Sequence, residues 1–247
     1  MSGTDANAGS VLAELHDLGL LLAMIPEFEH VTGRVQHDVY HVYTVDVHSV
    51  AAVDRLHAIA RGDVDDASAL PAQLLADADR LDLLCLATLL HDIGKGRGGA
   101  HARIGAEMAP AVAARLGLGD DDAEAVAWLV REHLTLYHVA TRRDPGDPAT
   151  VASLVESVGD PWRLRALYLL TVADLSTTSP TAMTSWKARV LDELYRRVDD
   201  ALRAGDPHLD QRLGTLRAEF AVACGAGRTK NTVELCLWSA NRSERTL

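Results

Sequence analysis

The stretch from residue 83 to residue 99 constrains this chain more than any other. Residues 83–90 read as a helix that is apolar on nearly every side, and such a helix belongs at the centre of a bundle. It runs directly into His91 and Asp92. Burying an imidazole beside a carboxylate is costly unless a partner compensates them, and a metal ion commonly does so. We expect the functional site here, although a helix cap with a satisfied polar pair also fits the dipeptide alone.

Composition favours a helical protein. Hydrophobic residues make up 48% of the 247 residues, but aromatic residues make up only 4%. With abundant Ala and Leu, this composition favours a helical bundle over a sheet sandwich. No stretch reads convincingly as a strand. We therefore predict an all-α fold, a bundle of about seven to nine helices.

Charge and cysteine usage exclude several classes of protein. The formal net charge of −11 disfavours binding to nucleic acid or to an anionic membrane. The apolar run at residues 18–25 is too short to span a bilayer. Cys85, Cys224 and Cys236 have neither a pairing pattern nor zinc-ligand spacing. We expect a cytoplasmic protein with no nucleic-acid partner and no membrane partner.

The chain divides into three parts. Residues 1–9 are predicted to be disordered, and residues 10–204 are predicted to form one domain. Residues 205–247 are predicted to be a C-terminal extension, with one helix at 209–224 followed by a poorly structured tail. Ser10 is the expected N-cap of the first helix.

Helical periodicity and helix-stop signals place most of the other elements. The last strong helix is expected to turn Trp186, Val190, Leu194 and Val198 toward the core. Residues 26–36 are expected to form a loop, and residues 134–141 to be the end of the helix that begins at Asp120. The helices are predicted at about 10–24, 40–56, 83–90, 101–116, 120–141, 149–158, from 161 and at 184–202.

Some titratable side chains fall on apolar faces. His41 and His48 are seven residues apart and share one helix face, so they are candidates either for metal ligands or for core histidines. His133 lies on a buried stripe of the helix from Asp120. Asp174 continues the apolar spacing of its helix, and a carboxylate there needs a metal ion or an arginine.

The sequence His91-Asp92-Ile93-Gly94-Lys95 after an apolar helix resembles the central motif of the HD-domain metal-dependent phosphohydrolases. The resemblance implies that the His-Asp pair ligates a divalent metal together with an earlier His and a later Asp. Because His48-Ser49-Val50-Ala51 resembles the first-ligand helix of that family, we prefer His48 to His41 as the first ligand. His41 stays a candidate for a residue that contacts the ligands. The implied ligands are His48, His91, Asp92 and Asp174.

Two more histidines extend the resemblance. His101 and His133 occupy the positions at which several HD hydrolases hold a second metal ion; a phosphate contact or a core position is the alternative for each. Imidazole and carboxylate ligands without thiolate favour Mn²⁺, Fe²⁺ or Mg²⁺ over structural zinc. The resemblance implies one or two ions, with Asp92 and Lys95 as catalytic residues and Lys95 also contacting the phosphate. Arg97 reads as a solvated loop cation.

A closer resemblance covers roughly residues 15–205. It is to the HD domain of the bifunctional PII-protein uridylyltransferase/uridylyl-removing enzymes, and it implies a phosphodiesterase that hydrolyses the UMP-tyrosine bond of a uridylylated PII signalling protein. We further hypothesise that Arg142 and Arg143 bind substrate. The similar segments are Pro26-Glu27-Phe28 and residues 36–46, 91–99, 127–131, 142–144, 170–174 and 185–187.

The chain departs from that family at several points. Val47 replaces an acidic residue before the first His ligand, and Ala100 and Ala102 replace polar neighbours of His101. Motifs of the nucleotidyltransferase and glutamine-sensing domains are not found, so uridylylation is not expected of this chain by itself. Two alternatives therefore stay open: a stand-alone HD hydrolase of a small nucleotide, and a degenerate HD domain that serves as a regulatory or binding module.

Overall fold

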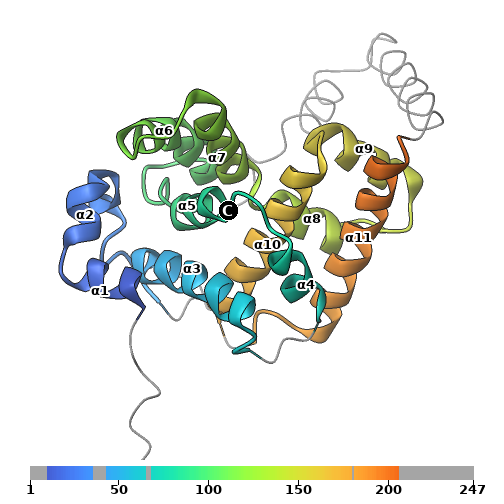
Figure 1. Ribbon diagram of the computed structural model, residues 1–247, viewed down its shortest axis with the longest axis horizontal. Coiled ribbons are helices and arrows are strands. Elements are labelled where there is room, and N and C mark those ends of the chain that lie inside the picture. The colour runs from blue at the N-terminus through green and yellow to red at the C-terminus, as the bar shows by residue number, and fades with distance from the viewer. Residues whose placement is uncertain (1–9, 36–42, 65–67, 180, 206–247) are drawn as a thin grey trace, which may run out of the picture.

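The computed structural model describes residues 10–35, 43–64, 68–179 and 181–205. Within these ranges the regular structure is entirely helical (Figure 1), which confirms the predicted fold class. The described part holds eleven α-helices, more than the predicted range, because some predicted segments divide into short helices. They are α1 (Val11–Asp17), α2 (Leu20–Met24), the 3₁₀-helix η1 (Pro26–His30), α3 (Val45–Arg61), α4 (Leu70–Ala76), α5 (Leu81–Leu90), α6 (His101–Arg115), α7 (Asp120–Glu132), α8 (Thr135–Arg142), α9 (Pro148–Val158), α10 (Pro161–Thr178) and α11 (Ser185–Ala204).

Helix α5 lies at the centre, as its apolar sequence predicts. It contacts α3, α7 and α10, and its side chains Leu84, Ala87 and Leu90 are buried. With apolar neighbours on several sides, the helix needs no polar face. The residues that follow its last turn, His91 and Asp92, are therefore buried as well.

The N-terminal segment differs from the prediction. Ser10 caps α1 by accepting a hydrogen bond from the Ala13 backbone N–H at 3.0 Å, as expected. However, Gly19 adopts a left-handed conformation with φ of 72°, which divides the predicted helix into α1 and α2. The segment predicted as a loop starts with η1, which buries Phe28.

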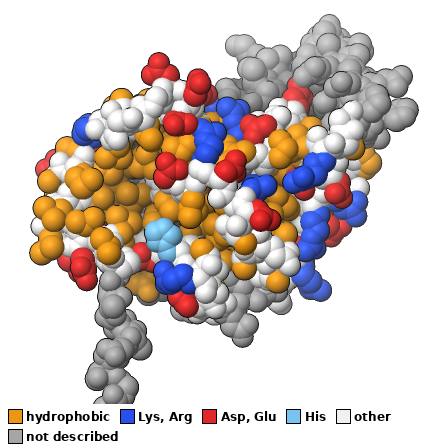
Figure 2. Space-filling view, viewed as in Figure 1, with side chains coloured by type: hydrophobic (Ala, Val, Ile, Leu, Met, Phe, Trp, Pro, Cys, Tyr) orange, Lys and Arg blue, Asp and Glu red, His pale blue; other side chains and the backbone are white. Residues whose placement is uncertain are grey.

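Apolar side chains gather on the side of the molecule formed by α1 and α2 (Figure 2). Leu21 is the one fully buried side chain of these two helices. The large apolar side chains exposed on and between them are Val11, Leu18, Leu20 and Met24.

Helices α6 and α7 pack against each other as a hairpin. A Cβ on Gly105 of α6 would lie 3.0 Å from the Val130 side chain of α7, so glycine permits this close approach. Three aspartates begin α7, where they complement the helix dipole. The hairpin places the start of α6 beside the end of α7, which brings His101 next to His133.

Helix α10 packs on α3 and α11. Asp160 caps it by accepting a hydrogen bond from the Arg163 backbone N–H at 2.9 Å. Along α11, Leu194 and Val198 are buried as predicted, but the inward placement of Trp186 was wrong because 49% of this residue is exposed. Trp186 lies in the first turn of α11, before that helix enters the core.

Residues 134–141 do not simply end α7. Helix α7 stops at Glu132, and a separate helix α8 follows the turn at His133. No helix in the described ranges is long and apolar enough to cross a membrane. The predicted disordered segment 1–9, His41 and the predicted helix at 209–224 lie outside the described residues.

Candidate metal centre

Six side chains that the sequence selected converge at the centre of the bundle. They come from α3, from the turn after α5, from the start of α6, from the end of α7 and from α10. Four of them are almost fully buried, and the other two, His101 and Asp174, keep part of their side chains exposed. The six are His48, His91, Asp92, His101, His133 and Asp174.

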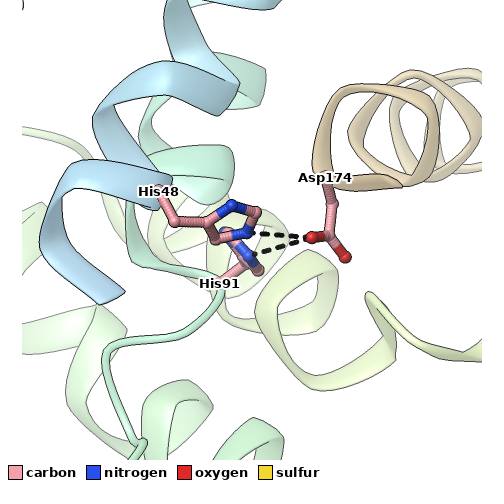
Figure 3. Close-up of side chains that lie close together, drawn as sticks. All are labelled: His48, His91 and Asp174. Atoms are coloured by element: carbon pink, nitrogen blue, oxygen red, sulfur yellow. Dashed lines mark hydrogen bonds and ion pairs between the residues drawn. The ribbon is translucent and has the colours of Figure 1, made fainter. Parts of the chain in front are cut away.

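The first donor group consists of His48, His91 and Asp174. Figure 3 shows the two imidazoles directed at the Asp174 carboxylate from separate segments of the chain. Asp174 Oδ1 lies 3.0 Å from His48 Nε2 and 3.7 Å from His91 Nε2. Asp174 keeps 18% of its side chain exposed, so the group is open to solvent on that side.

The second donor group consists of Asp92, His101 and His133. Asp92 Oδ1 lies 3.5 Å from His101 Nε2 and 4.0 Å from His133 Nε2. The Nε2 atoms of the two histidines are 3.4 Å apart. One donor atom from each residue therefore faces a shared point, as in the first group.

Asp92 connects the two groups through its two oxygens. Oδ1 faces the second group, whereas Oδ2 lies 3.3 Å from His91 Nε2 and 3.9 Å from His48 Nε2. The ammonium of Lys95 forms an ion pair with Oδ2 at 2.6 Å. One carboxylate thus has an oxygen available to each group.

Hydrogen bonds fix how two of the imidazoles are oriented. Nδ1 of His91 donates to the Thr88 carbonyl at 2.6 Å, and Nδ1 of His133 donates to the Val130 carbonyl at 2.8 Å. Each Nε2 is then free to act as a ligand. His91 Nε2 is buried and makes no hydrogen bond of good geometry, although carboxylate oxygens of Asp92 and Asp174 lie 3.3 Å and 3.7 Å from it.

This donor set fits a divalent ion in each group. Metal-nitrogen bonds are about 2.0–2.1 Å long, so neighbouring ligand atoms around one ion lie roughly 3 Å apart. The separations given above for the two groups run from 3.0 to 4.0 Å. Imidazole and carboxylate donors suit Mn²⁺, Fe²⁺ and related ions. His48, His91 and Asp174 would hold one ion, His101 and His133 a second, and Asp92 would contact both.

The electrostatics of the two groups differ. Burial alone would lower the pKa of His91, but the charges of Asp92 and Asp174 outweigh it and raise this pKa to about 10. Burial, reinforced by the positive charge of His91, lowers the pKa of His133 to about 3. Burial also lowers the pKa of His101. At neutral pH the second group therefore presents two unprotonated imidazoles, while His91 holds a proton between carboxylates.

The pKa of His91 predicts how metal binding depends on pH. Below about pH 10 the metal-free protein keeps a proton on His91, and a metal ion must displace this proton to bind Nε2. We expect the dissociation constant for Mn²⁺ to fall as pH rises from 6.5 to 8.5, by up to about tenfold per unit. Calorimetric titration in buffers of different ionisation enthalpy should also detect a released proton. A pH-independent dissociation constant with no proton release would contradict this expectation.

A family model for the HD domain matches residues 45–177, which include all six donors. The chain belongs to the HD-domain family. Curated relatives named bifunctional uridylyltransferase/uridylyl-removing enzyme are similar over most of the chain. The protein of Bordetella pertussis is 44% identical over 193 residues, which are 78% of this chain and 22% of that protein. The protein of Gluconobacter oxydans is 43% identical over 191 residues, or 77% of this chain and 20% of that protein.

The HD domain matched here is only one part of those relatives. The chain also aligns with the same enzyme of Azospirillum brasilense, at 42% identity over 194 residues, or 78% of this chain and 21% of that protein. It thus spans about a fifth of the length of these relatives. Family membership and the donor set together support a metal-dependent phosphohydrolase.

The departures from the family pattern differ in their surroundings. Val47 is 38% exposed on α3, whereas its neighbour His48 is buried. Ala100 is the N-cap of α6, and this helix begins without a side-chain cap. An aspartate at that position would be a favoured cap, so the change to Ala100 removes support next to His101.

A cavity of about 550 Å³ opens over the HD-domain site. That volume lies within the range of about 300–1,000 Å³ that small-molecule sites occupy. Donor residues form one wall of the cavity together with Lys95. The lining also includes Tyr137, Ser179 and Lys187, none of which the sequence analysis selected, although residues 185–187 belong to a segment that resembles the family.

Arg142 and Arg143 are not part of the cavity wall. Both are exposed at the end of α8. Arg142 is nevertheless close to the rim, since burial and then the charge of Arg142 lower the pKa of His138, which lines the cavity. Substrate binding by the two arginines stays a prediction.

Proposed function

We propose that this HD domain is a phosphodiesterase that hydrolyses the UMP-tyrosine bond of a uridylylated PII-type protein. The observation that carries the proposal is the pair of donor groups connected by Asp92, four of whose six residues line a nucleotide-sized cavity. The names of the relatives include a uridylyl-removing activity, which supports the choice of substrate.

The chemistry follows from the residues around the cavity. When bound, divalent ions supply Lewis acidity toward a phosphoryl oxygen and lower the pKa of water. Lys95 lines the cavity and holds its ammonium 2.6 Å from Asp92 Oδ2, so this ammonium can donate to a phosphoryl oxygen held beside Asp92. Asp92 keeps its negative charge because ion pairs with His91 and Lys95 hold its pKa well below the usual range despite burial.

The site suits a phenol as the leaving group. His101 and His133 would hold a metal ion, so neither would serve as a general acid. A tyrosine hydroxyl has a pKa of about 10 and leaves as phenolate more readily than an aliphatic alkoxide does. A phosphodiester of tyrosine therefore demands less of a general acid than an ester of an aliphatic alcohol.

Arg142 and Arg143 are assigned to the protein partner in this proposal. Their exposed position at the end of α8 suits contact with the surface that carries the modified tyrosine. Changing both arginines to glutamate tests this assignment, because it reverses their charge and leaves every cavity-lining residue in place.

The direct test is to incubate the chain with uridylylated PII and Mn²⁺ and to measure the release of UMP. A panel of free nucleotides, assayed in parallel, addresses the small-nucleotide alternative. We expect UMP to be released from PII, and we expect this release to stop when EDTA is added. Cleavage of a free nucleotide without cleavage of uridylylated PII would overturn the proposed substrate. A protein that binds no metal ion and is indifferent to EDTA would instead indicate a regulatory or binding module.

A further inference from the structure

Lys187 places a positive charge on the cavity wall without an acidic partner. Its Nζ donates to the Ala182 carbonyl at 2.7 Å and lies 5.4 Å from the centroid of the Tyr137 ring. Among the described residues, no carboxylate forms an ion pair with it. Lys95, in the same cavity, is by contrast paired with Asp92 at 2.6 Å. Because an ammonium has three donors, Lys187 has hydrogen-bonding capacity left for a ligand.

Ser179 adds a second unsatisfied donor to this wall. Its hydroxyl oxygen is buried and has no hydrogen-bond partner, although the residue lines the cavity. Buried hydroxyls are normally hydrogen-bonded. A ligand that accepts hydrogen bonds from both Ser179 and Lys187 would satisfy the two together, and the half-buried ring of Tyr137 offers a flat surface beside them.

We propose that Tyr137, Ser179 and Lys187 form a base-binding subsite that accepts the uracil ring of the nucleotide. This inference rests on the proposed function, because it takes a uridylyl phosphodiester as the substrate. The phosphoryl group belongs at the donor groups, where Lys95 also lies. Of its two substituents, the tyrosine is attached to a folded protein and must approach from outside, so we place the nucleoside against Tyr137, Ser179 and Lys187 in the cavity.

The chemistry of uracil matches this wall. Its two carbonyl oxygens are acceptors for the Lys187 ammonium and the Ser179 hydroxyl, and its face can stack on the Tyr137 ring. Cytosine carries an amino group in place of one carbonyl, and adenine carries an amino group and has no carbonyl, so each base would present a donor to an ammonium. The wall therefore discriminates against these bases through an unpaired donor as well as favouring uracil.

The test compares two chromogenic phosphodiesters in the presence of Mn²⁺. One is p-nitrophenyl uridylate, and the other is bis(p-nitrophenyl) phosphate, which has no base. For Lys187→Met, we expect the ratio of kcat/KM for the first substrate to that for the second to fall about tenfold or more, as loss of a charged hydrogen bond predicts. Lys187→Arg should recover part of the ratio. Circular dichroism and thermal melting of each variant report whether the fold is intact.

An equal fall in kcat/KM for both substrates would overturn the subsite, because Lys187 would then act on the phosphoryl group or on the fold. A second measurement needs no turnover: uridine, which lacks a phosphoryl group, is expected to bind the full chain and to bind Lys187→Met more weakly. The subsite would also be overturned if uridine did not bind the full chain, or if Lys187→Met bound it as tightly. If the chromogenic uridylate is cleaved in a Lys187-dependent way but uridylylated PII is not, the subsite stands and the proposed protein substrate fails.

Discussion

Asp92→Asn is expected to lower kcat/KM for phosphodiester hydrolysis by about 10³-fold or more, because metal activation contributes several kcal/mol to such reactions. Asparagine preserves the shape of the side chain but removes the charge that both donor groups share. It also leaves Lys95 without its 2.6 Å carboxylate partner. Metal content measured by mass spectrometry should fall together with activity, which separates loss of the metal from loss of a catalytic contact.

His101→Ala is the matched comparison for Asp92→Asn. His101 belongs to the second group alone, so its removal leaves the first group's three donors in place. We expect a smaller loss of activity and a partial loss of metal. If Asp92→Asn kept more than a tenth of the wild-type kcat/KM with its metal content unchanged, Asp92 would not be the shared ligand.

Gly94→Ala is expected to reduce the free energy of unfolding by about 3 kcal/mol or more, at the upper end of the cost of overpacking. A Cβ at residue 94 would lie 2.1 Å from the His101 carbonyl oxygen and 2.7 Å from the Gly105 backbone nitrogen. These are backbone atoms of α6, so no side-chain rotation can relieve the clash. The first turn of α6 would have to move, and His101 would move with it.

Chemical denaturation with and without Mn²⁺ measures this effect. Gly119→Ala is a suitable control, because Gly119 has a φ of −74° and a Cβ there meets nothing within 4 Å. We expect the control to stay within about 1 kcal/mol of the wild type. Wild-type stability and metal binding in Gly94→Ala would show that the turn after α5 is not packed against α6 as described.

The resemblance to a known family anticipated the convergence of the six donors, and helical patterns supported it for two of them. Asp174 interrupts the apolar face of α10, and His133 ends the buried stripe of α7. A motif that resembled a known family then connected them to His91 and Asp92. The structure brings these side chains together, while metal binding by each of them stays a prediction.

Other features depended on tertiary contacts that periodicity does not reveal. The turn at His133, which separates α7 from α8, is fixed partly by the hydrogen bond from His133 to the Val130 carbonyl. Trp186 fits the apolar stripe of α11 yet lies in its first turn, outside the core. The subsite proposed around Lys187 combines α8 with the end of α10 and the first turn of α11, and no local sequence signal joins such distant segments.

Anomalous diffraction from crystals grown with Mn²⁺ tests the central claim most directly. We predict one peak among His48, His91 and Asp174 and a second among Asp92, His101 and His133, both absent from Asp92→Asn crystals. Manganese bound elsewhere, or none at these side chains at saturating concentration, would contradict the account.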